Sequence, residues 1–372
     1  MPTTRTVRRA WPIAAVFGAC CAVLAQDPAP SATPGGQDAG AELKAALDAG
    51  HAWLQRHQDE DGRWSAAAFL VHDPKGAPCD GLGKPDQDVF VTSLVVTACF
   101  GFGQLPDDAG THTHLCRALQ WLQSQVREDG SIGIAGSGAI VRDTGAAADV
   151  LASARRYHAS GTVGADLSAT VQKLRQWRRE DGLWSRAAAG QQADWVASTL
   201  VLECLAGFST DGLALGALDG NSALDPPQGP LRAATNVLDG IAGLDPAKGP
   251  LRAAHGGAAH LAAWYVRDPE RRAKFCTALG TDPPQPHLPS ERFDMLAWYF
   301  TTQAMQFHDE PTWNAWWQAL VATAKATQRR DGSFAGSWDP TDVRGREAGR
   351  IYATAAMLLA LEVAWRKEYR DK

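Results

Sequence analysis

Two carboxylates in the stretch Asp86-Gln87-Asp88-Val89 have a spacing that could perform acid chemistry. Two carboxyl groups held close together raise the pKa of one of them, which then keeps a proton that it can donate. The same two residues stand just before an apolar run, where Asp commonly caps a helix and interacts with its dipole. The sequence therefore offers either a proton donor or a helix cap here, and we favour the cap.

A second group with chemical potential is His112, His114 and Cys116, in the segment Thr-His-Thr-His-Leu-Cys. Residues two positions apart on a helix point about 200° apart, so these ligands could converge on a metal only in a non-helical segment. We interpret the segment as a solvated helix start and predict neither a metal nor a cofactor. The sequence also has no Gly-rich phosphate loop, no Gly-x-Ser-x-Gly and no His-Glu-x-x-His, which argues against nucleotide hydrolases, serine hydrolases and zincins.

The elements that carry these residues are predicted by a signature that recurs along the chain. Its copies are AWLQRHQDEDGRW at 52–64, QWLQSQVREDGSI at 120–132, RQWRREDGLW at 175–184 and AKATQRRDGSF at 324–334. Each copy predicts a helix that ends at Asp-Gly, because Gly adopts the left-handed conformation without a Cβ penalty. The residue two positions after that Gly is expected to fold back onto the last turn; these residues are Trp64, Ile132, Trp184 and Phe334.

A second apolar helix is predicted after each signature, at 87–104, 141–158, 191–208 and 347–366, so the repeating unit is a helical hairpin of about fifty residues. The 150 residues between Gly182 and Gly332 must hold one degenerate hairpin, at 256–279 and 293–308, and an insertion at 212–254. In the insertion, LDPPQGPLRAA at 224–234 recurs as LDPAKGPLRAA at 244–254. Its paired Pro and Gly residues predict a surface loop or lid.

These repeats resemble the QW repeats of the prenyltransferase and squalene cyclase superfamily, and the resemblance covers most of residues 41–372. It implies an all-α fold, namely an α/α toroid of about five helical hairpins that form a double ring around a central cavity, as in terpenoid cyclases and protein prenyltransferases. The closing segment 334–366 also resembles the last repeat of exported members of this superfamily from planctomycete-like bacteria.

The resemblance implies two kinds of chemistry, and the motifs of both are incomplete. Prenyltransferase β subunits bind zinc through Asp-x-Cys and a distant His, but this chain has no Asp-x-Cys, and Val91 occupies the nearest equivalent of the His. Squalene-type cyclases protonate an alkene with the middle Asp of Asp-x-Asp-Asp, but Val89 replaces the last Asp after Asp88. No catalytic residue is assigned from the sequence.

Residues that face the cavity are predicted by aligning the inner helices on their apolar patterns. Thr92, Ser198, Thr301 and Thr354 then share one register, and an Asp lies four residues before each of the first two, on the same helix face. The predicted cavity-lining set is Asp88, Thr92, Asp194, Trp195, Ser198, Trp298, Tyr299, Thr301, Tyr352 and Thr354. Polar residues that recur in apolar helices need hydrogen-bond partners, which the cavity or their own helix could provide.

The composition is that of a globular protein without a basic surface: 372 residues, 45% hydrophobic and 21% charged, with a net charge of -5. We therefore predict no nucleic-acid partner. Arg5, Arg8 and Arg9 precede the apolar stretch 10–24 and a cleavage site after Ala25, which predicts a signal peptide at 1–25. Residues 26–40 are predicted to be a flexible linker, followed by the toroid at 41–372.

The predicted location is thus the periplasm or cell envelope, or the medium, with no transmembrane segment in the mature chain. The predicted function is that of a ligand-binding or scaffold protein whose partner is an apolar small molecule, a glycan or an envelope protein. Two alternatives stay open, so the sequence does not decide whether the protein is an enzyme. One is a cyclase- or prenyltransferase-like enzyme for an isoprenoid or another apolar substrate, and the other is a polysaccharide-binding or lyase-like toroid. A dry aromatic cavity with one acid would indicate an enzyme, and a wet groove rich in Thr and Arg would indicate binding.

Overall fold

The fold is known from a computed structural model that describes residues 36–106, 112–157, 166–210, 256–257, 260, 269–281, 283–286 and 293–370. The described helices are α1 (Gly36–Arg56), α2 (Asp88–Gly101), α3 (Thr113–Ser124), α4 (Ile140–Tyr157), α5 (Ser168–Gln176), α6 (Trp195–Thr210), α9 (Pro269–Gly280), α10 (Met295–Met305), α11 (Glu310–Thr327) and α12 (Gly345–Trp365). The predicted signal peptide at 1–25 and insertion at 212–254 lie outside the described residues.

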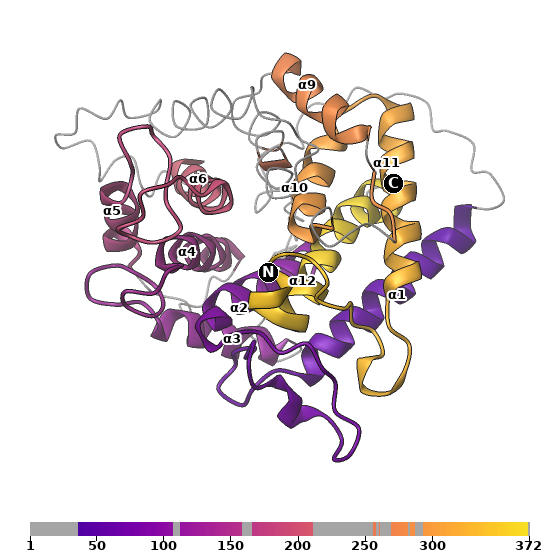
Figure 1. Ribbon diagram of the computed structural model, residues 1–372, viewed down its shortest axis with the longest axis horizontal. Coiled ribbons are helices and arrows are strands. Elements are labelled where there is room, and N and C mark those ends of the chain that lie inside the picture. The colour runs from indigo at the N-terminus through magenta and orange to yellow at the C-terminus, as the bar shows by residue number, and fades with distance from the viewer. Residues whose placement is uncertain are drawn as a thin grey trace, which may run out of the picture.

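The helices form two layers, as the all-α toroid prediction requires. The inner helices are α2, α4, α6, α10 and α12; α4 packs against α2 and α6, and α12 packs against α10 and α2. Inner sequences such as DVFVTSLVVTACFG are apolar on all sides, which is typical of a helix enclosed by other helices. The other five helices pack outside them, with α1 and α11 on one side of the molecule and α5 on the opposite side (Figure 1). The predicted fold class is confirmed.

Five described hairpins, α1/α2, α3/α4, α5/α6, α9/α10 and α11/α12, carry this double layer. Three further described residues, Gly256, Gly257 and His260, are helical and lie between α6 and α10 in the sequence. A Cβ atom on Gly257 would lie 2.4 Å from the hydroxyl of Thr199 on α6, and one on Gly256 would lie 2.8 Å from the hydroxyl of Thr301 on α10. The two glycines therefore let these residues fill the space between these inner helices.

The turn of each signature is held in the same way. The backbone N–H of the residue two positions after the turn Gly donates to a hydroxyl oxygen on the following inner helix, at 2.9 to 3.3 Å. The donor and acceptor pairs are Trp64 and Thr92, Ile132 and Thr144, Trp184 and Ser198, and Trp338 and Thr354. We call these four hydrogen bonds the turn locks. They bury a polar side chain in an apolar helix without leaving it unsatisfied.

The fourth turn differs from the sequence prediction by four residues. The N–H of Arg329 donates to the carbonyl of Ser337, whereas the equivalent bonds in the other turns span four residues, as from Asp59 to Arg63. Gly336, with φ 102, and Trp338 therefore take the positions that the sequence assigned to Gly332 and Phe334. An insertion of four residues in this turn, which the shared Asp-Gly pair concealed, explains the wrong prediction.

The last hairpin meets the first one through the contact that joins successive hairpins. The side-chain amide of Gln58 donates to the carbonyl of His114 on α3, and that of Gln328 donates to the carbonyl of Ala46 on α1. Gly62 lies against the backbone of Arg117 on α3, as Gly336 lies against the backbone of Ala49 on α1. Because the same contact recurs between the ends of the chain, the outer layer closes from α11 onto α1.

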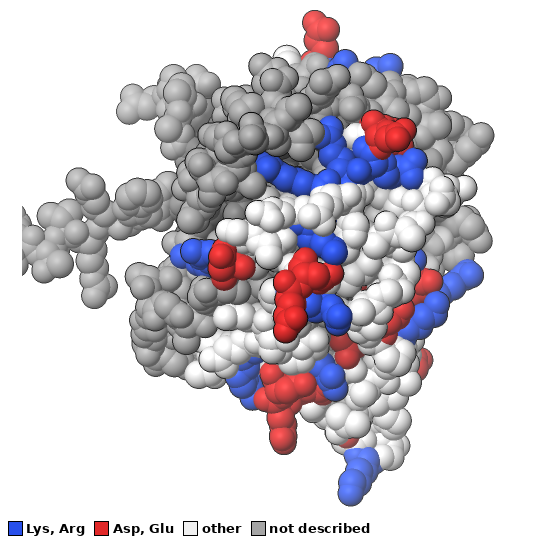
Figure 2. Space-filling view, turned by 90° about the vertical axis from the view of Figure 1, so that its left-hand side faces the viewer, with Lys and Arg blue, Asp and Glu red and all other residues white. Residues whose placement is uncertain are grey.

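The surface carries both signs of charge side by side, and Figure 2 shows Lys and Arg next to Asp and Glu on the face that it draws. Among the described residues, no helix combines the length and the apolar character that crossing a bilayer requires. In the described part of the chain, the five cysteines after residue 25 form no disulfide; they are Cys79, Cys99, Cys116, Cys204 and Cys276.

Candidate functional site

A cavity of about 260 Å³ opens where the N-terminal ends of the inner helices converge. Its lining comes from four inner helices and the turns before them, namely Gln87, Phe90, Arg142, Arg186, Asp194, Val196, Val343, Arg344, Glu347 and Ala348. Three guanidinium groups and two carboxylates thus face a space with one aromatic ring. We call it the arginine cavity. Its lining is polar and charged rather than dry and aromatic.

Each arginine of the cavity is held by a carboxylate. Arg142, on α4, donates to Asp143 at 2.6 Å and to the side-chain oxygen of Gln87 at 2.9 Å, and its guanidinium lies 3.9 Å from the centre of the Phe90 ring. Arg344 donates to Asp294 at 2.6 Å. These pairs fix the arginines without using all five N–H groups of any guanidinium.

Arg186 differs from the other two arginines in one respect. One terminal nitrogen donates to Glu347 at 2.7 Å, but its buried Nε has no hydrogen-bond partner among the described residues. A buried N–H without a partner costs about 1 to 3 kcal/mol unless a water or a ligand satisfies it. Arg186 lines the cavity, and its side chain is 36% exposed, so a water or a bound molecule can reach it.

Beside the cavity lies a pair of buried carboxylates, Asp294 and Asp342. Asp294 caps α10 by accepting the N–H of Ala297, and Asp342 accepts the N–H of Gly345 at the start of α12. The hydroxyl of Tyr352 also donates to Asp342, at 3.0 Å. Burial and the neighbouring Asp294 raise the pKa of Asp342 to about 6. The arrangement provides a carboxyl group that can hold a proton near neutral pH.

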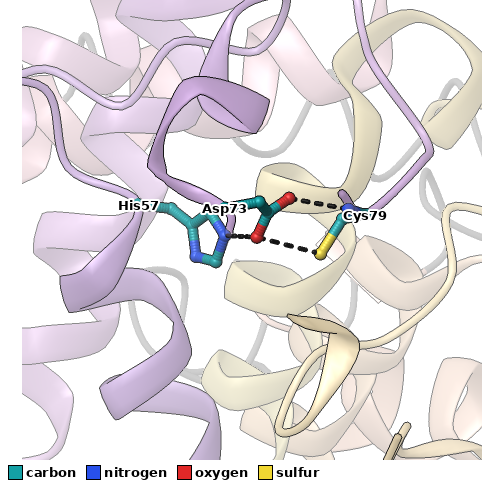
Figure 3. Close-up of side chains that lie close together, drawn as sticks. All are labelled: His57, Asp73 and Cys79. Carbon is teal, nitrogen blue, oxygen red and sulfur yellow. Dashed lines mark hydrogen bonds and ion pairs between the residues drawn. The ribbon is translucent and has the colours of Figure 1, made fainter. Parts of the chain in front are cut away.

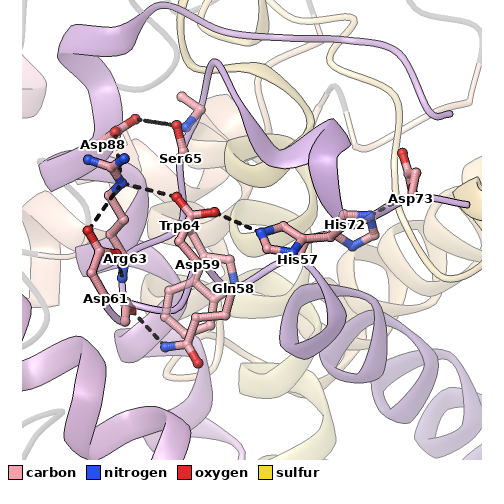
Figure 4. A network of polar contacts seen from close by, with 12 residues as sticks. His57, Gln58, Asp59, Asp61, Arg63, Trp64, Ser65, His72, Asp73 and Asp88 are labelled. Carbon is pink, nitrogen blue, oxygen red and sulfur yellow. Dashed lines mark hydrogen bonds and ion pairs between the residues drawn. The ribbon is translucent and has the colours of Figure 1, made fainter. Parts of the chain in front are cut away.

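Of the two predicted acids, Asp194 lies in the arginine cavity, where its side chain caps α6 by accepting the N–H of Ala197 at 2.7 Å. Asp88 is not among the lining residues. It accepts the N–H of Ala66 at 2.8 Å and lies beside Arg63 and Ser65, as Figure 4 shows. Burial raises the pKa of Asp88 to about 6, and it anchors the loop before α2 instead of capping that helix.

The predicted hydroxyl register has a structural use. Thr92, Ser198 and Thr354 are completely buried and accept the turn locks, so their hydroxyl groups are occupied within the hairpins. Thr301 does not share this role. Asp294 and Asp194 cap their helices in the same way, which places Trp298, four residues after Asp294, in the register of Ser198.

The predicted aromatic candidates also lie among the inner helices. Trp298 and Tyr352 are fully buried, and Trp195 is partly buried at the start of α6. The hydroxyl of Tyr299 accepts a hydrogen bond from Gln303 on its own helix. The Tyr352 ring stacks on Phe90, with ring centres 6.2 Å apart, so it stands behind a residue of the cavity wall.

Residues 112–116 of the Thr-His-Thr-His-Leu-Cys segment lie at the start of α3, as predicted, but the prediction of a solvated helix start is wrong for His114. Nδ1 of His112 donates a hydrogen bond to the carbonyl oxygen of Leu105, and His112 lies directly before the helix, whereas His114 is buried. Burial, chiefly, lowers the pKa of His114 to about 4. The described residues gather three metal-ligand side chains at a different place, which is His57, Asp73 and Cys79.

The sequence predicted neither the arginine cavity nor the acid pair beside it. Arg142, Arg186 and Arg344 come from non-equivalent positions of different repeats, so no register relates them. One signal was available: a charged residue such as Arg142 in the run IVRDTGAAA is expensive to bury without a partner, and so indicates a site.

The all-α toroid architecture agrees with the fold of the solved structures that the chain resembles. An apo single-residue variant of the type II terpene cyclase MstE from Scytonema superposes with a TM-score of 0.51 at 16% identity, covering 89% of this chain and 99% of that one. Another variant of MstE, in complex with its substrate geranylgeranyl dihydroxybenzoate, gives a TM-score of 0.50 at 14% identity, with the same coverage.

A protein from Actinoplanes gives a TM-score of 0.50 at 15% identity, covering 88% of this chain and 99% of that one. No family model and no curated protein matches the sequence. At these identities the likeness establishes the terpenoid cyclase-like fold of this chain.

Proposed function

We propose that this toroid is a binding protein that holds the anionic group of a small molecule in the arginine cavity. The observation that carries the proposal is the buried, unpartnered Nε of Arg186 in a cavity lined by three guanidinium groups. Guanidinium groups recognise carboxylate and phosphate through paired, charge-assisted hydrogen bonds. A carboxylate or phosphate oxygen at Arg186 would supply the acceptor that is missing there.

The charges around the cavity favour one anionic group over a highly charged ligand. Asp194 and Glu347 also line the cavity, and Asp143 and Asp294 hold two of the arginines from behind. A second or third anionic group would meet these carboxylates. Phe90, Val196 and Val343 provide apolar surface for the rest of the molecule.

The test is calorimetric titration of the protein with benzoate and with inorganic phosphate. We expect Arg186→Gln to weaken binding of the anion at least roughly tenfold, because a charge-assisted hydrogen bond contributes about 1.5 to 3 kcal/mol. Arg127→Gln is the matched control, since Arg127 is exposed and lies 4.0 Å from Asp129, outside the cavity. The proposal would be refuted if both variants and the wild type bound the anion equally well. It would also be refuted if the wild type bound neither benzoate nor phosphate.

A second candidate function is supported by the acid pair. Asp342, with its raised pKa, and the Tyr352 hydroxyl stand next to the arginine cavity. The type II terpene cyclase MstE, whose fold this chain resembles, binds geranylgeranyl dihydroxybenzoate as its substrate. An acid of this kind could protonate a substrate alkene. Incubation with that compound should then yield a product of unchanged mass, because a cyclisation takes up one proton and releases another. Asp342→Asn should abolish the product. The same change at Asp48, which is exposed on α1, should not.

The location proposed for this binding is outside the cytoplasm. Its support is the signal peptide predicted at residues 1–25 and the resemblance of residues 334–366 to exported proteins. N-terminal sequencing of the protein from cell envelopes should begin near Gln26, and a sequence that begins at Met1 would contradict the proposal.

A further inference from the structure

Three side chains with metal-ligand atoms meet at the end of α1, away from the arginine cavity. His57 follows the last turn of α1, Asp73 follows the short helix Phe69–His72, and Cys79 lies six residues further along the same loop. Nε2 of His57 is 2.9 Å from Oδ1 of Asp73, and the thiol of Cys79 is 3.5 Å from the same oxygen. Figure 3 shows the three side chains pointing toward one another.

Burial makes this arrangement unusual for a loop. The side chains of His57 and Asp73 are both 2% exposed, and Cys79 is 5% exposed. The His57 ring also stacks on Trp53, with ring centres 4.0 Å apart. Polar groups at such depth need partners that satisfy them completely, because water does not reach them freely.

The hydrogen bonds of His57 determine which of its nitrogens can bind a ligand. Nδ1 lies 2.7 Å from the carbonyl oxygen of Trp53, which can only accept, so Nδ1 carries a hydrogen. In the neutral ring the lone pair of Nε2 therefore points at the carboxylate of Asp73, where two acceptors would face each other. Either a second ring proton, which would make an ion pair with Asp73, or a metal cation between the two atoms removes this conflict. A ring N–H donated to a backbone carbonyl is also the usual second contact of a metal-bound His.

We propose that His57, Asp73 and Cys79 form a binding site for a divalent transition metal ion, of which Zn²⁺ fits the ligand set best. Imidazole, carboxylate and thiolate are the three protein ligand types of zinc. The three ligand atoms lie within 4.8 Å of one another. Tetrahedral zinc with bonds of about 2.0 to 2.3 Å holds its ligand atoms roughly 3.3 to 3.6 Å apart, so small side-chain movements suffice.

Binding is a simple exchange. The Cys79 thiol releases its proton to solvent, the sulfur donates an electron pair to Zn²⁺, and neither the metal nor the protein changes oxidation state. Oδ2 of Asp73 keeps the backbone N–H of Cys79, which donates to it at 2.6 Å, so the carboxylate stays oriented while Oδ1 binds the metal. Three protein ligands leave a fourth position open.

The contacts around the site show which parts of the chain a metal would join. The loop of Asp73 and Cys79 is already joined to the closing hairpin, because Arg350 on α12 binds Asp80 and the Ser333 hydroxyl donates to the carbonyl of Ala77 at 2.6 Å. On the other side, His72 binds Asp59 at 2.7 Å, as Figure 4 shows. A metal would fasten this loop to the first outer helix, next to the junction of the first and last hairpins.

The experiment uses the full mature chain and zinc alone. Protein treated with a chelator is equilibrated with Zn²⁺, separated from free metal and analysed for zinc by mass spectrometry. We expect a stoichiometric amount of zinc in the wild type. Cys79→Ser and Asp73→Asn should bind at least about tenfold more weakly, a loss typical of altered metal sites. Cys276→Ser is the control, since Cys276 is buried on α9 outside the site and should leave binding intact.

A spectroscopic measurement keeps the proposal testable if a variant fails to fold. Co²⁺ added to the metal-free wild type should produce a thiolate-to-cobalt charge-transfer absorption, which Cys276→Ser retains and Cys79→Ser lacks. A wild-type protein that binds no zinc and gives no such absorption would show that the three residues form a hydrogen-bonded ion pair only. Equal zinc content in Cys79→Ser would also overturn the proposal. Neither outcome depends on whether the arginine cavity binds an anion.

Discussion

The turns of the hairpins and the N-terminal ends of the inner helices are neighbours in the sequence, but they differ in how similar the repeats are. The turns repeat the same hydrogen bond, whereas the helix ends carry different side chains. In four turns, the same backbone N–H donates to a hydroxyl at the same place on the next helix, as from Trp64 to Thr92. At the helix ends, only a few residues away, the repeats supply different groups to the arginine cavity, such as Arg142, Asp194 and Glu347.

This difference shows where the repeat has kept its structure and where it has been free to change. A turn lock satisfies a buried backbone N–H in four of the five described hairpins, so the physical requirement is the same in each of these four. The cavity faces one shared space, and each repeat can contribute a different group to it. The fold follows from what the repeats share, and function is to be sought where they diverge.

The largest effect is expected from Gly62→Ala in a turn. Gly62 has φ 98, and a Cβ atom there would lie 2.4 Å from backbone atoms of Arg117, so we expect a loss of at least about 4 kcal/mol or a failure to fold. Gly76 has a similar φ of 89 but no atom within 4 Å of an added Cβ, so Gly76→Ala should cost only about 1 to 2 kcal/mol. Urea unfolding measures both, and equal losses would show that the turn tolerates a shift.

A smaller effect, dependent on pH, is expected at the acid pair. The folded-state pKa of Asp342, about 6, exceeds its ordinary value, so between pH 4 and 6 the native state binds more protons than the unfolded state. The free energy of unfolding therefore falls as pH rises through this window. Relative to Asp342→Asn, the wild type should lose up to roughly 3 kcal/mol between pH 4 and 7. Parallel pH profiles of the two proteins would contradict the raised pKa.

Removal of a turn lock should lower the free energy of unfolding less than substitution of the turn glycine Gly62 does. Thr92→Val keeps the shape of the side chain but leaves the buried N–H of Trp64 without an acceptor, which should cost about 1 to 3 kcal/mol. Thr97→Val is the matched control, because the Thr97 hydroxyl only donates to the carbonyl of Ser93 on its own helix. In chemical unfolding, Thr92→Val should lower the free energy of unfolding more than Thr97→Val, and equal losses would mean that the hydrogen bond contributes nothing.

The smallest effect on stability is expected in the cavity. Arg186→Gln removes a charge that pairs with partly exposed Glu347, and such pairs contribute about 0 to 1 kcal/mol. The free energy of unfolding should therefore change by less than Thr92→Val changes it, while anion binding weakens at least roughly tenfold. A variant that unfolds as readily as the turn variants would mean that Arg186 belongs to the structure instead of to a site.

The sequence predicted the parts of the molecule that depend on local patterns. Asp-Gly turns located the hairpins, and the apolar runs located α2, α4, α6 and α12 to within a few residues. The alignment was wrong where a pattern misled: the Asp-Gly at Gly332 belongs to an insertion, and Thr301 lies outside the register of Ser198. Local spacing cannot reveal such shifts, because only contacts with the next helix fix the register.

The candidate sites were less predictable because they join residues that are far apart in the chain. Arg186 meets Glu347 across 161 positions, and His57 meets Cys79 through a loop with no regular spacing. Among the predicted cavity residues, Asp194 lines the cavity because it caps the N-terminal end of α6, which reaches the cavity. The hydroxyl of Thr92 instead accepts a hydrogen bond from the turn residue Trp64. The periodicity of a single helix does not distinguish a residue that lines the cavity from one that bonds to a turn.

The most direct test of the central claim, that the arginine cavity takes an anionic group, is a crystal structure of the protein soaked with 4-bromobenzoate. Anomalous scattering locates the bromine directly, and the electron density locates the carboxylate. We predict a carboxylate oxygen within hydrogen-bond distance of Nε of Arg186, with the ring against Phe90. Bromine signals only at exposed arginines, with no ligand density at Arg186, would contradict the account.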